Sequence, residues 1–318
     1  MAFRMKSLQI LCSPGAGALT VALAGLLLAA CGGSGGGVDT PTAAPQVPSS
    51  PAPPSVPTPA PTPAPGPAPV PTTAPPGYQL VWSDEFTTGG LPDATRWDYD
   101  TARNAQGWYN NERQYYARSR FANSGVADGK LVITARREDL SSASDWGGQR
   151  YTSARLVTRG KASWTYGFFE VRAKLPCGVG TWPAIWMLGT GGRWPEDGEI
   201  DIMEQVGSNP SRVFGTVHTQ AGFGGNSRGG ATEVADACSA FRNYQMTWTT
   251  SDIRFAVDGV EYFRYPNPRT GRAAWPFDAP QYLLLNIAIG GDLGGAVDER
   301  IFPVTLEIDH VRVYQVAQ

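Results

Sequence analysis

Three acidic residues within one short stretch, Glu199, Asp201 and Glu204, could act together as catalytic carboxylates. On a strand, side chains alternate between two faces, so Glu199 and Asp201 share one face while the isoleucines beside them occupy the other. A one-residue β-bulge at Ile202 or Met203 would bring Glu204 back to the acidic face. Carboxylates held this close raise one another's pKa, which suits a general acid that works beside an ionised nucleophile. The same pattern is also compatible with a solvated strand face or with a cation site.

The segments that must position these acids have the sequence patterns of strands. Apolar and polar residues alternate in most of them, and Asp258-Gly259 supplies a hairpin turn. The run 282–289 is almost wholly apolar, as in a strand buried on both faces. No helical period extends over ten residues, so many strands and 38 glycines predict an all-β sandwich rather than an α/β barrel. The expected strands are 130–136, 167–174, 253–257, 260–265, 282–289 and 305–314.

Residues 1–77 carry signals for export and tethering. Two basic residues precede an apolar run at 16–30, which is typical of a signal peptide. The run ends in Leu28-Ala-Ala-Cys31, which resembles the lipobox of bacterial lipoproteins, where cleavage precedes a cysteine that then carries lipid. Sixteen of the 27 prolines fall within 41–77, a composition that does not build a hydrophobic core.

These signals predict the organisation of the chain. We expect a signal peptide at 1–30, a lipidated Cys31 with a Gly- and Pro-rich linker over 31–77, and one catalytic domain over 78–318. Such a chain would be exported and held on a membrane through Cys31, and Gly32 directly after that cysteine favours the outer membrane or cell surface. The alternative is an ordinary signal peptide in which Cys31 is incidental.

The composition argues against several classes of protein. A net charge of −2 with 17% charged residues makes nucleic acid an unexpected partner. Four cysteines in 318 residues are too few for a small, disulfide-dense scaffold. No apolar run reaches about 20 residues, so we do not expect a multi-pass membrane protein. We expect the chain to be a monomer.

The acidic stretch resembles the Glu-x-Asp-x-x-Glu signature of glycoside hydrolase family 16, in its laminarinase-like (endo-β-1,3-glucanase) branch. Other blocks resemble the same family in the family's order, and together they span most of residues 80–314. The resemblance implies a β-jelly-roll sandwich (concanavalin A-like) of two antiparallel sheets, with a concave face that forms a sugar-binding cleft. The blocks are Trp82–Phe86, Asn110–Tyr115, Tyr166–Glu170, Gly180–Trp186, Gly215–His218, Trp275–Asp278, Asn286–Gly291 and Asp309–Tyr314.

The resemblance also implies a role for each acid. Glu199 would be the nucleophile, Glu204 the general acid and base, and Asp201 a hydrogen-bond partner of the nucleophile. The implied reaction retains the anomeric configuration and needs no cofactor for catalysis. The inserted Met203 favours β-1,3-glucan, because mixed-linkage (lichenase-type) members lack that residue. A polysaccharide of another type (mixed-linkage glucan, agar or porphyran), a transglycosylase and a non-catalytic glucan-binding module are the alternatives.

Sugar contacts are expected from aromatic and polar residues of the same domain. All ten tryptophans lie within 78–318, and indole rings stack on the apolar faces of sugars. The resemblance places the tryptophans that flank the acids in sequence in or near the cleft, and core packing is the alternative for Trp186. Asn111 and Arg155 are candidates for hydroxyl contacts at the glycone subsites, and His218 is expected to face the cleft near Glu204. The expected substrate-binding residues are Trp182, Trp186, Trp194, Asn111, Arg155 and His218.

A structural calcium ion is a further expectation. Many members of the family bind Ca²⁺ on the convex side, and the matching oxygen donors here would be Glu85, the carbonyl of Gly129 and Asp309. Each of these residues could equally be an ordinary turn or surface residue.

The remaining cysteines could form a disulfide. Cys12 would leave with the signal peptide and Cys31 would carry lipid, which leaves Cys177 and Cys238 in a compartment that permits disulfides. Two separate buried thiols are the alternative.

Overall fold

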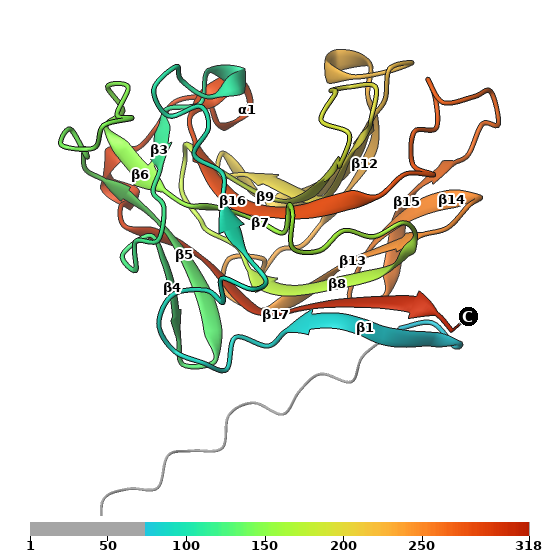
Figure 1. Cartoon of the computed structure of the whole chain (residues 1–318). Helices are drawn as coiled ribbons and strands as arrows, with labels where there is room; N and C mark the ends of the chain where they lie inside the picture. The colour runs from blue at the N-terminus through green and yellow to red at the C-terminus, as the bar shows by residue number, and fades with distance from the viewer. Residues whose placement is uncertain (1–73, 318) are drawn as a thin grey trace, which may run out of the picture. The chain divides into compact units, whose positions relative to one another are not determined.

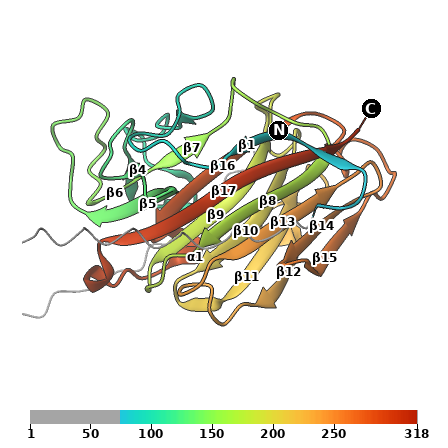
Figure 2. The ribbon, with the colours of Figure 1, turned by 90° about the horizontal axis from the view of Figure 1, so that it is seen from below.

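The computed structural model describes residues 74–317, so the expectations for the signal peptide, for Cys31 and for most of the linker lie outside the described residues. Residues 74–317 form two β-sheets that pack face to face as two layers (Figures 1 and 2). The expected all-β sandwich is confirmed. Helical structure in this part of the chain consists of α1 (Gly291–Gly294) and the short 3-10 helices η1 (Tyr109–Asn111), η2 (Gly224–Asn226) and η3 (Glu299–Ile301).

The seven-stranded sheet carries the acidic stretch on β10, between β9 and β11. Its order is β12-β11-β10-β9-β16-β7-β2, with antiparallel neighbours throughout. Strand β16 is buried at every position, as its apolar sequence predicts. The strands are β2 (Asp98–Tyr99), β7 (Arg155–Val157), β9 (Thr181–Gly189), β10 (Glu199–Val206), β11 (Asn209–His218), β12 (Arg228–Glu233) and β16 (Gln281–Ile289).

The ten-stranded sheet forms the second layer, in the order β15-β14-β13-β8-β17-β5-β6-β3, with β1 on β17 and β4 on β5. Strands β3 and β6 pair in parallel, an exception to the expected antiparallel pairing. The strands are β1 (Tyr78–Asp84), β3 (Gln114–Tyr116), β4 (Ser124–Ala127), β5 (Lys130–Arg137), β6 (Tyr151–Ser153), β8 (Gly167–Lys174), β13 (Arg242–Trp248), β14 (Asp252–Val257), β15 (Val260–Pro266) and β17 (Val304–Val316).

The hydrophobic core between the sheets follows from alternation along the strands. Met187 on β9 and Ile200 and Ile202 on β10 are fully buried, and they share one cluster with Phe169 on β8 and Phe255 on β14. Burial of each such side chain contributes about 1.5–3 kcal/mol to folding. The core therefore fixes the inner face of β10, which leaves the opposite face of this strand for the acids.

Cys177 and Cys238 form a disulfide whose Cα atoms lie 5.7 Å apart, as expected. The bond joins the connection after β8 to the connection before β13. Among residues 74–317, no helix is long and apolar enough to span a membrane.

The residues expected to bind Ca²⁺ lie on neighbouring strands of the ten-stranded sheet. Glu85 follows β1, Gly129 lies in the β4–β5 turn with a φ of 70°, and Asp309 is on β17. Strand β17 pairs with both β1 and β5, so these segments are adjacent.

Both carboxylates already have cationic partners within the chain. Glu85 accepts two hydrogen bonds from Arg312, at 2.9 and 2.8 Å, and Asp309 Oδ2 lies 3.1 Å from His310 Nδ1. The Arg312 hydrogen bond lowers the pKa of Glu85, and the His310 contact lowers the pKa of Asp309. A Ca²⁺ ion would have to share Glu85 with Arg312 or compete with it, and calcium binding stays a prediction.

If calcium binds here, it joins the first strand of the domain to the last and stabilises the fold. At a free Ca²⁺ concentration about a hundred times its Kd, binding adds about 2.7 kcal/mol to the free energy of unfolding. For a domain of this size, each kcal/mol raises the Tm by roughly 2–4 °C. Adding CaCl₂ to EDTA-treated protein should therefore raise the Tm by roughly 5–10 °C. Asp309→Ala should remove this response. Equal melting temperatures with calcium and with EDTA would contradict the site.

Candidate active site

A β-bulge on β10 places the acids together. Asp201 pairs with Trp186 on β9, whereas the next pairs along these strands are Met203 with Ile185 and Glu204 with Ala184. Between these two pairs β10 has one more residue than β9, which is the definition of a bulge. The bulge predicted at Ile202 or Met203 is confirmed. We call the resulting surface of the sheet, which carries Glu199, Asp201 and Glu204, the acidic face.

The neighbouring strand shows that Glu204 belongs to this face. Trp182, Ala184 and Trp186 are two residues apart on β9, so their side chains point to the same side of the sheet. Asp201 pairs with Trp186, and Glu204 pairs with Ala184. The Trp182 indole N–H donates a hydrogen bond of 2.9 Å to Glu204 Oε1, and Glu204 is only 8% exposed.

Glu199 lies half-buried at the start of β10 and receives a hydrogen bond from a loop. The donor is the indole N–H of Trp194, in the β9–β10 connection. Trp194 itself is 50% exposed, so its ring is available to a ligand while its N–H holds the carboxylate. The two glutamates are thus each oriented by a tryptophan from a different segment.

Asp201 faces His218, the last residue of β11. The Nε2 atom of His218 lies 3.2 Å from Asp201 Oδ2, and its Nδ1 atom accepts a 3.2 Å hydrogen bond from the backbone N–H of Gly224. Because Nδ1 is an acceptor, the neutral ring carries its proton on Nε2, towards Asp201. In register His218 stands opposite Glu199, and it is also close enough to Glu204, near which it was expected, to act on the pKa of that group in the lowering direction.

Burial raises the pKa of all three carboxyl groups. The pKa of Glu199 rises to about 8, first by burial and then by the adjacent Asp201 carboxylate, while His218 and the Trp194 hydrogen bond act in the lowering direction. Burial also raises the pKa of Asp201, to about 7. The pKa of Glu204 is raised well above its ordinary value by burial and by Asp201. Burial and the neighbouring carboxylates therefore favour the protonated form of Glu204, which is the form that a general acid needs.

A polar and aromatic group extends from the acids across β16 and β7. The Trp186 indole N–H donates to Asn286 Oδ1 at 2.8 Å, and Asn286 donates to the hydroxyl of Tyr116 at 3.1 Å. The buried guanidinium of Arg155 lies between the rings of Trp186 and Trp108, 4.5 and 5.1 Å from their centroids. Trp186 is half-buried on the acidic face, so the structure brings it and Arg155 together beside the acids.

Asn111 lies farther from the acids, at the exposed end of η1. Its side-chain amide donates a 2.7 Å hydrogen bond to Asp292 in α1. The neighbouring Glu112 accepts hydrogen bonds from Gln114 and Asn110, and burial raises its pKa. Asn286, Asp292 and Glu112 were not singled out from the sequence, although Glu112 and Asn286 belong to blocks that carry the family resemblance.

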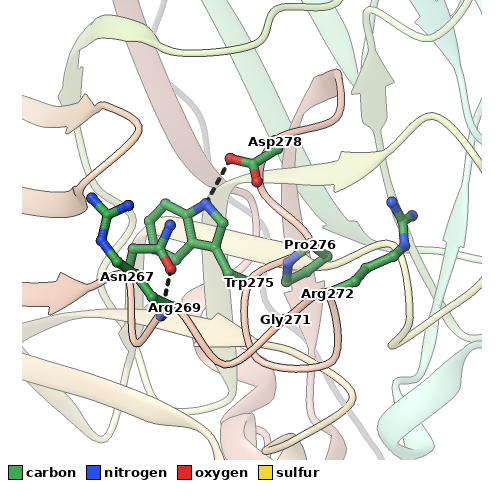
Figure 3. Close-up of a pocket in the computed structure, with 7 residues that line it drawn as sticks. All are labelled: Asn267, Arg269, Gly271, Arg272, Trp275, Pro276 and Asp278. Carbon is green, nitrogen blue, oxygen red and sulfur yellow. Dashed lines mark hydrogen bonds between the residues drawn. The ribbon is translucent and has the colours of Figure 1, made fainter.

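Among the described residues, the acidic face itself could also hold a cation, and one pocket lies apart from it. Glu199, Asp201 and His218 place one donor atom each within 4.8 Å of one another, an arrangement that could also hold a cation. A separate pocket of about 290 Å³ lies in the turn between β15 and β16 (Figure 3). There the Trp275 indole N–H donates to Asp278 Oδ1 at 2.9 Å. This pocket contains none of the expected catalytic, sugar-binding or metal-binding residues, although three of its residues belong to the block Trp275–Asp278.

Comparison with known proteins supports a carbohydrate-active site. Residues 111–301 match the family described as Glycosyl hydrolases family 16. The chain is 51% identical over 254 residues to the Beta-glucanase of Rhodothermus marinus, which covers 76% of this chain and 86% of that protein.

Solved structures of β-glucanases are also similar to this chain. The X-ray structure of the laminarinase from Rhodothermus marinus is similar with a TM-score of 0.71 and 50% identity, covering 76% of this chain and 98% of that one. A mutant of SCLam, a non-specific endo-β-1,3(4)-glucanase co-crystallised with 1,3-β-D-cellotriosyl-glucose, is similar with a TM-score of 0.75 and 50% identity, covering 77% of this chain and 98% of that one.

The contacts of Glu199 predict how its ionisation responds to substitution. His218 and the Trp194 N–H both lower the pKa of Glu199, so His218→Gln and Trp194→Phe should each raise it. The ionised form would then be lost at a higher pH as the solution is acidified. The acidic limb of the profile of kcat/KM against pH, measured on laminarin, should therefore move to higher pH by on the order of one unit. If the acidic limb lies at the same pH in both variants as in the unchanged protein, the ionisation of Glu199 does not determine that limb.

Proposed function

Because the chain belongs to family 16 of the glycosyl hydrolases, we propose that it is an endo-β-1,3-glucanase that cleaves laminarin-type glucan with retention of configuration. The observation that carries the mechanism is the bulge on β10, which puts Glu204 on the same face as Glu199 and Asp201. A retaining glycosidase needs two carboxyl groups on either side of the scissile bond, one protonated and one ionised.

The reaction proceeds in two displacements. Glu204 donates its proton to the glycosidic oxygen while Glu199 attacks the anomeric carbon, so the C–O bond breaks and a glycosyl ester forms on Glu199. The ionised Glu204 then takes a proton from water, whose oxygen attacks the same carbon and releases Glu199 as a carboxylate. The charge of Asp201 raises the pKa of both glutamates, which favours the retention of a proton on one of them while the other is ionised.

Two observations support a β-1,3-glucan substrate. The first is the inserted residue at the bulge, because the resemblance implies that mixed-linkage members lack it. The second is that the similar solved structures include a laminarinase. A second candidate is mixed-linkage glucan, because the similar SCLam is described as a non-specific endo-β-1,3(4)-glucanase. Assays of the full chain on laminarin, lichenan, agarose and xyloglucan separate these possibilities. Binding of laminarin without cleavage would favour a glucan-binding module.

The roles of the two glutamates can be tested separately. Glu199→Gln should abolish turnover, because the amide cannot form the glycosyl ester. Glu204→Ala should also lose activity, but azide should restore it on an aryl glycoside with a good leaving group, since the small anion replaces water and its base in the second step. The azide product should have the β configuration, measured by proton NMR. Rescue of Glu199 variants instead would reverse the assignment.

We also propose that the enzyme acts outside the cytoplasm, anchored through lipid on Cys31. The support is the sequence of residues 1–31, with its basic start, apolar run and Leu-Ala-Ala-Cys end. Cys31→Ser should move the protein from the membrane fraction to the soluble fraction, with unchanged specific activity of the released enzyme. Mass spectrometry of an unlipidated mature N-terminus in the unchanged protein would contradict the anchor.

A further inference from the structure

One exposed aromatic residue beside the acids has no role in the mechanism above. Phe223 lies in the β11–β12 connection and is 45% exposed. Its ring packs edge-on against Trp194, with centroids 5.3 Å apart and planes at 74°. Trp194 in turn donates its indole N–H to Glu199. Phe223 therefore contacts the tryptophan that hydrogen-bonds to the proposed nucleophile, and a large part of the Phe223 side chain is exposed.

Backbone hydrogen bonds hold the Phe223 segment in place from two sides. Thr219 and Gly222 exchange hydrogen bonds of 2.9 and 3.0 Å, and Ala221 N–H donates to the Ala273 carbonyl at 2.8 Å. On the other side of Phe223, the N–H of Gly224 donates to His218 Nδ1. The position of the ring is thus tied both to the turn before β16 and to the histidine that faces Asp201. An exposed aromatic ring held in this way resembles a sugar platform more than a free surface residue.

The strand order puts Phe223 on the opposite side of the acids from Arg155. Trp186, Asn286 and Arg155 lie on β9, β16 and β7, to one side of β10, whereas the Phe223 segment connects β11 and β12 on the other side. In Figure 1, the turns before β12 rise on one side of the seven-stranded sheet and α1 rises on the other. A glucan chain that crosses β10 at the acids must therefore extend towards both groups.

We propose that Phe223, together with Trp194, forms a subsite for the glucose unit on the leaving-group side of the scissile bond. This inference rests on the proposed function. The apolar face of that sugar packs on the Phe223 ring, while Arg155 and Trp186 hold the part of the chain that stays attached to Glu199. After the first displacement the leaving sugar departs from Phe223, and either water or a new sugar acceptor takes its place. Phe223 is accordingly a specificity-determining residue and performs no chemical step.

The test compares two substrates that differ in their need for this subsite. Laminarihexaose places glucose units on both sides of the acids, whereas β-laminaribiosyl fluoride has a leaving group too small to reach Phe223. In the full-length protein, Phe223→Ala should lower the ratio of kcat/KM for the hexaose to kcat/KM for the fluoride by about fivefold to tenfold. Phe223→Trp should restore most of the ratio and Phe223→Leu should not, because a leucine fills space without offering a flat ring.

A matched control is Phe121→Ala, since Phe121 is also exposed, at 58%, and lies in the segment between β3 and β4. This variant should keep the wild-type ratio. A second readout uses the fluoride as donor and laminaribiose as acceptor, and the yield of tetrasaccharide should fall in Phe223→Ala.

The other outcomes overturn the proposal in distinguishable ways. An equal loss on both substrates would mean that Phe223 only supports Trp194 by packing. An unchanged ratio would mean that no sugar contacts Phe223. A wild-type protein inactive on both substrates would overturn the proposed function, and this subsite with it.

Discussion

Burial of three carboxyl groups on one face of a strand is the constraint on which the rest of the site depends. Like charges this close cannot all ionise, so at least one proton remains among Glu199, Asp201 and Glu204. Each carboxyl group has a facing N–H or ring nitrogen from a different segment, namely Trp194, His218 and Trp182. These partners replace part of the hydration that burial removes, which would otherwise cost several kcal/mol per ion. The two glutamates can therefore differ in protonation without moving apart.

The bulge on β10 lets one strand contribute to both the acidic face and the hydrophobic core. Without the extra residue, strict alternation would place Glu204 on the same face as Ile200 and Ile202, where an unpaired charge is strongly unfavourable. With it, Ile200, Ile202 and Met203 are all buried at 1% exposure or less while Glu204 reaches the acidic face. One inserted residue thus allows both a packed inner face and the placement of Glu204 on the acidic face, while regular pairing with β9 and β11 is interrupted between Asp201 and Glu204.

The sequence predicted the long strands well because alternation needs several residues to be visible. The stretches expected at 167–174 and 282–289 lie in β8 and β16, whereas β2, β3, β6 and β7 have only two or three residues and carry no period. The parallel pairing of β3 with β6 depends on contacts between distant segments, which no local pattern reports.

The same limit applies to the site. The acids and the bulge were readable from six residues, because type and spacing alone determine their faces. The contact of His218 with Asp201 could not be predicted, because it depends on the register of β11 against β10. Trp182 and Trp194 were expected as sugar platforms, and their hydrogen bonds to the glutamates became visible only in three dimensions.

The two sides of the acidic face are built differently, and the proposed reaction gives a physical reason. On one side, Trp186 and Asn286 lie on β9 and β16 and hydrogen-bond to each other within central strands of the sheet. On the other side, Trp194 and Phe223 come from connections between strands. In the proposed reaction the glycosyl group stays in the site from the first displacement to the end of the second, and it is bound to Glu199 between the two steps, so rigid contacts are useful throughout. The leaving sugar must depart before water can attack, and tight binding of that sugar would slow its release without helping the second step. Contacts carried by loops are suited to this transient role, because they can hold the sugar for bond cleavage and still let it go.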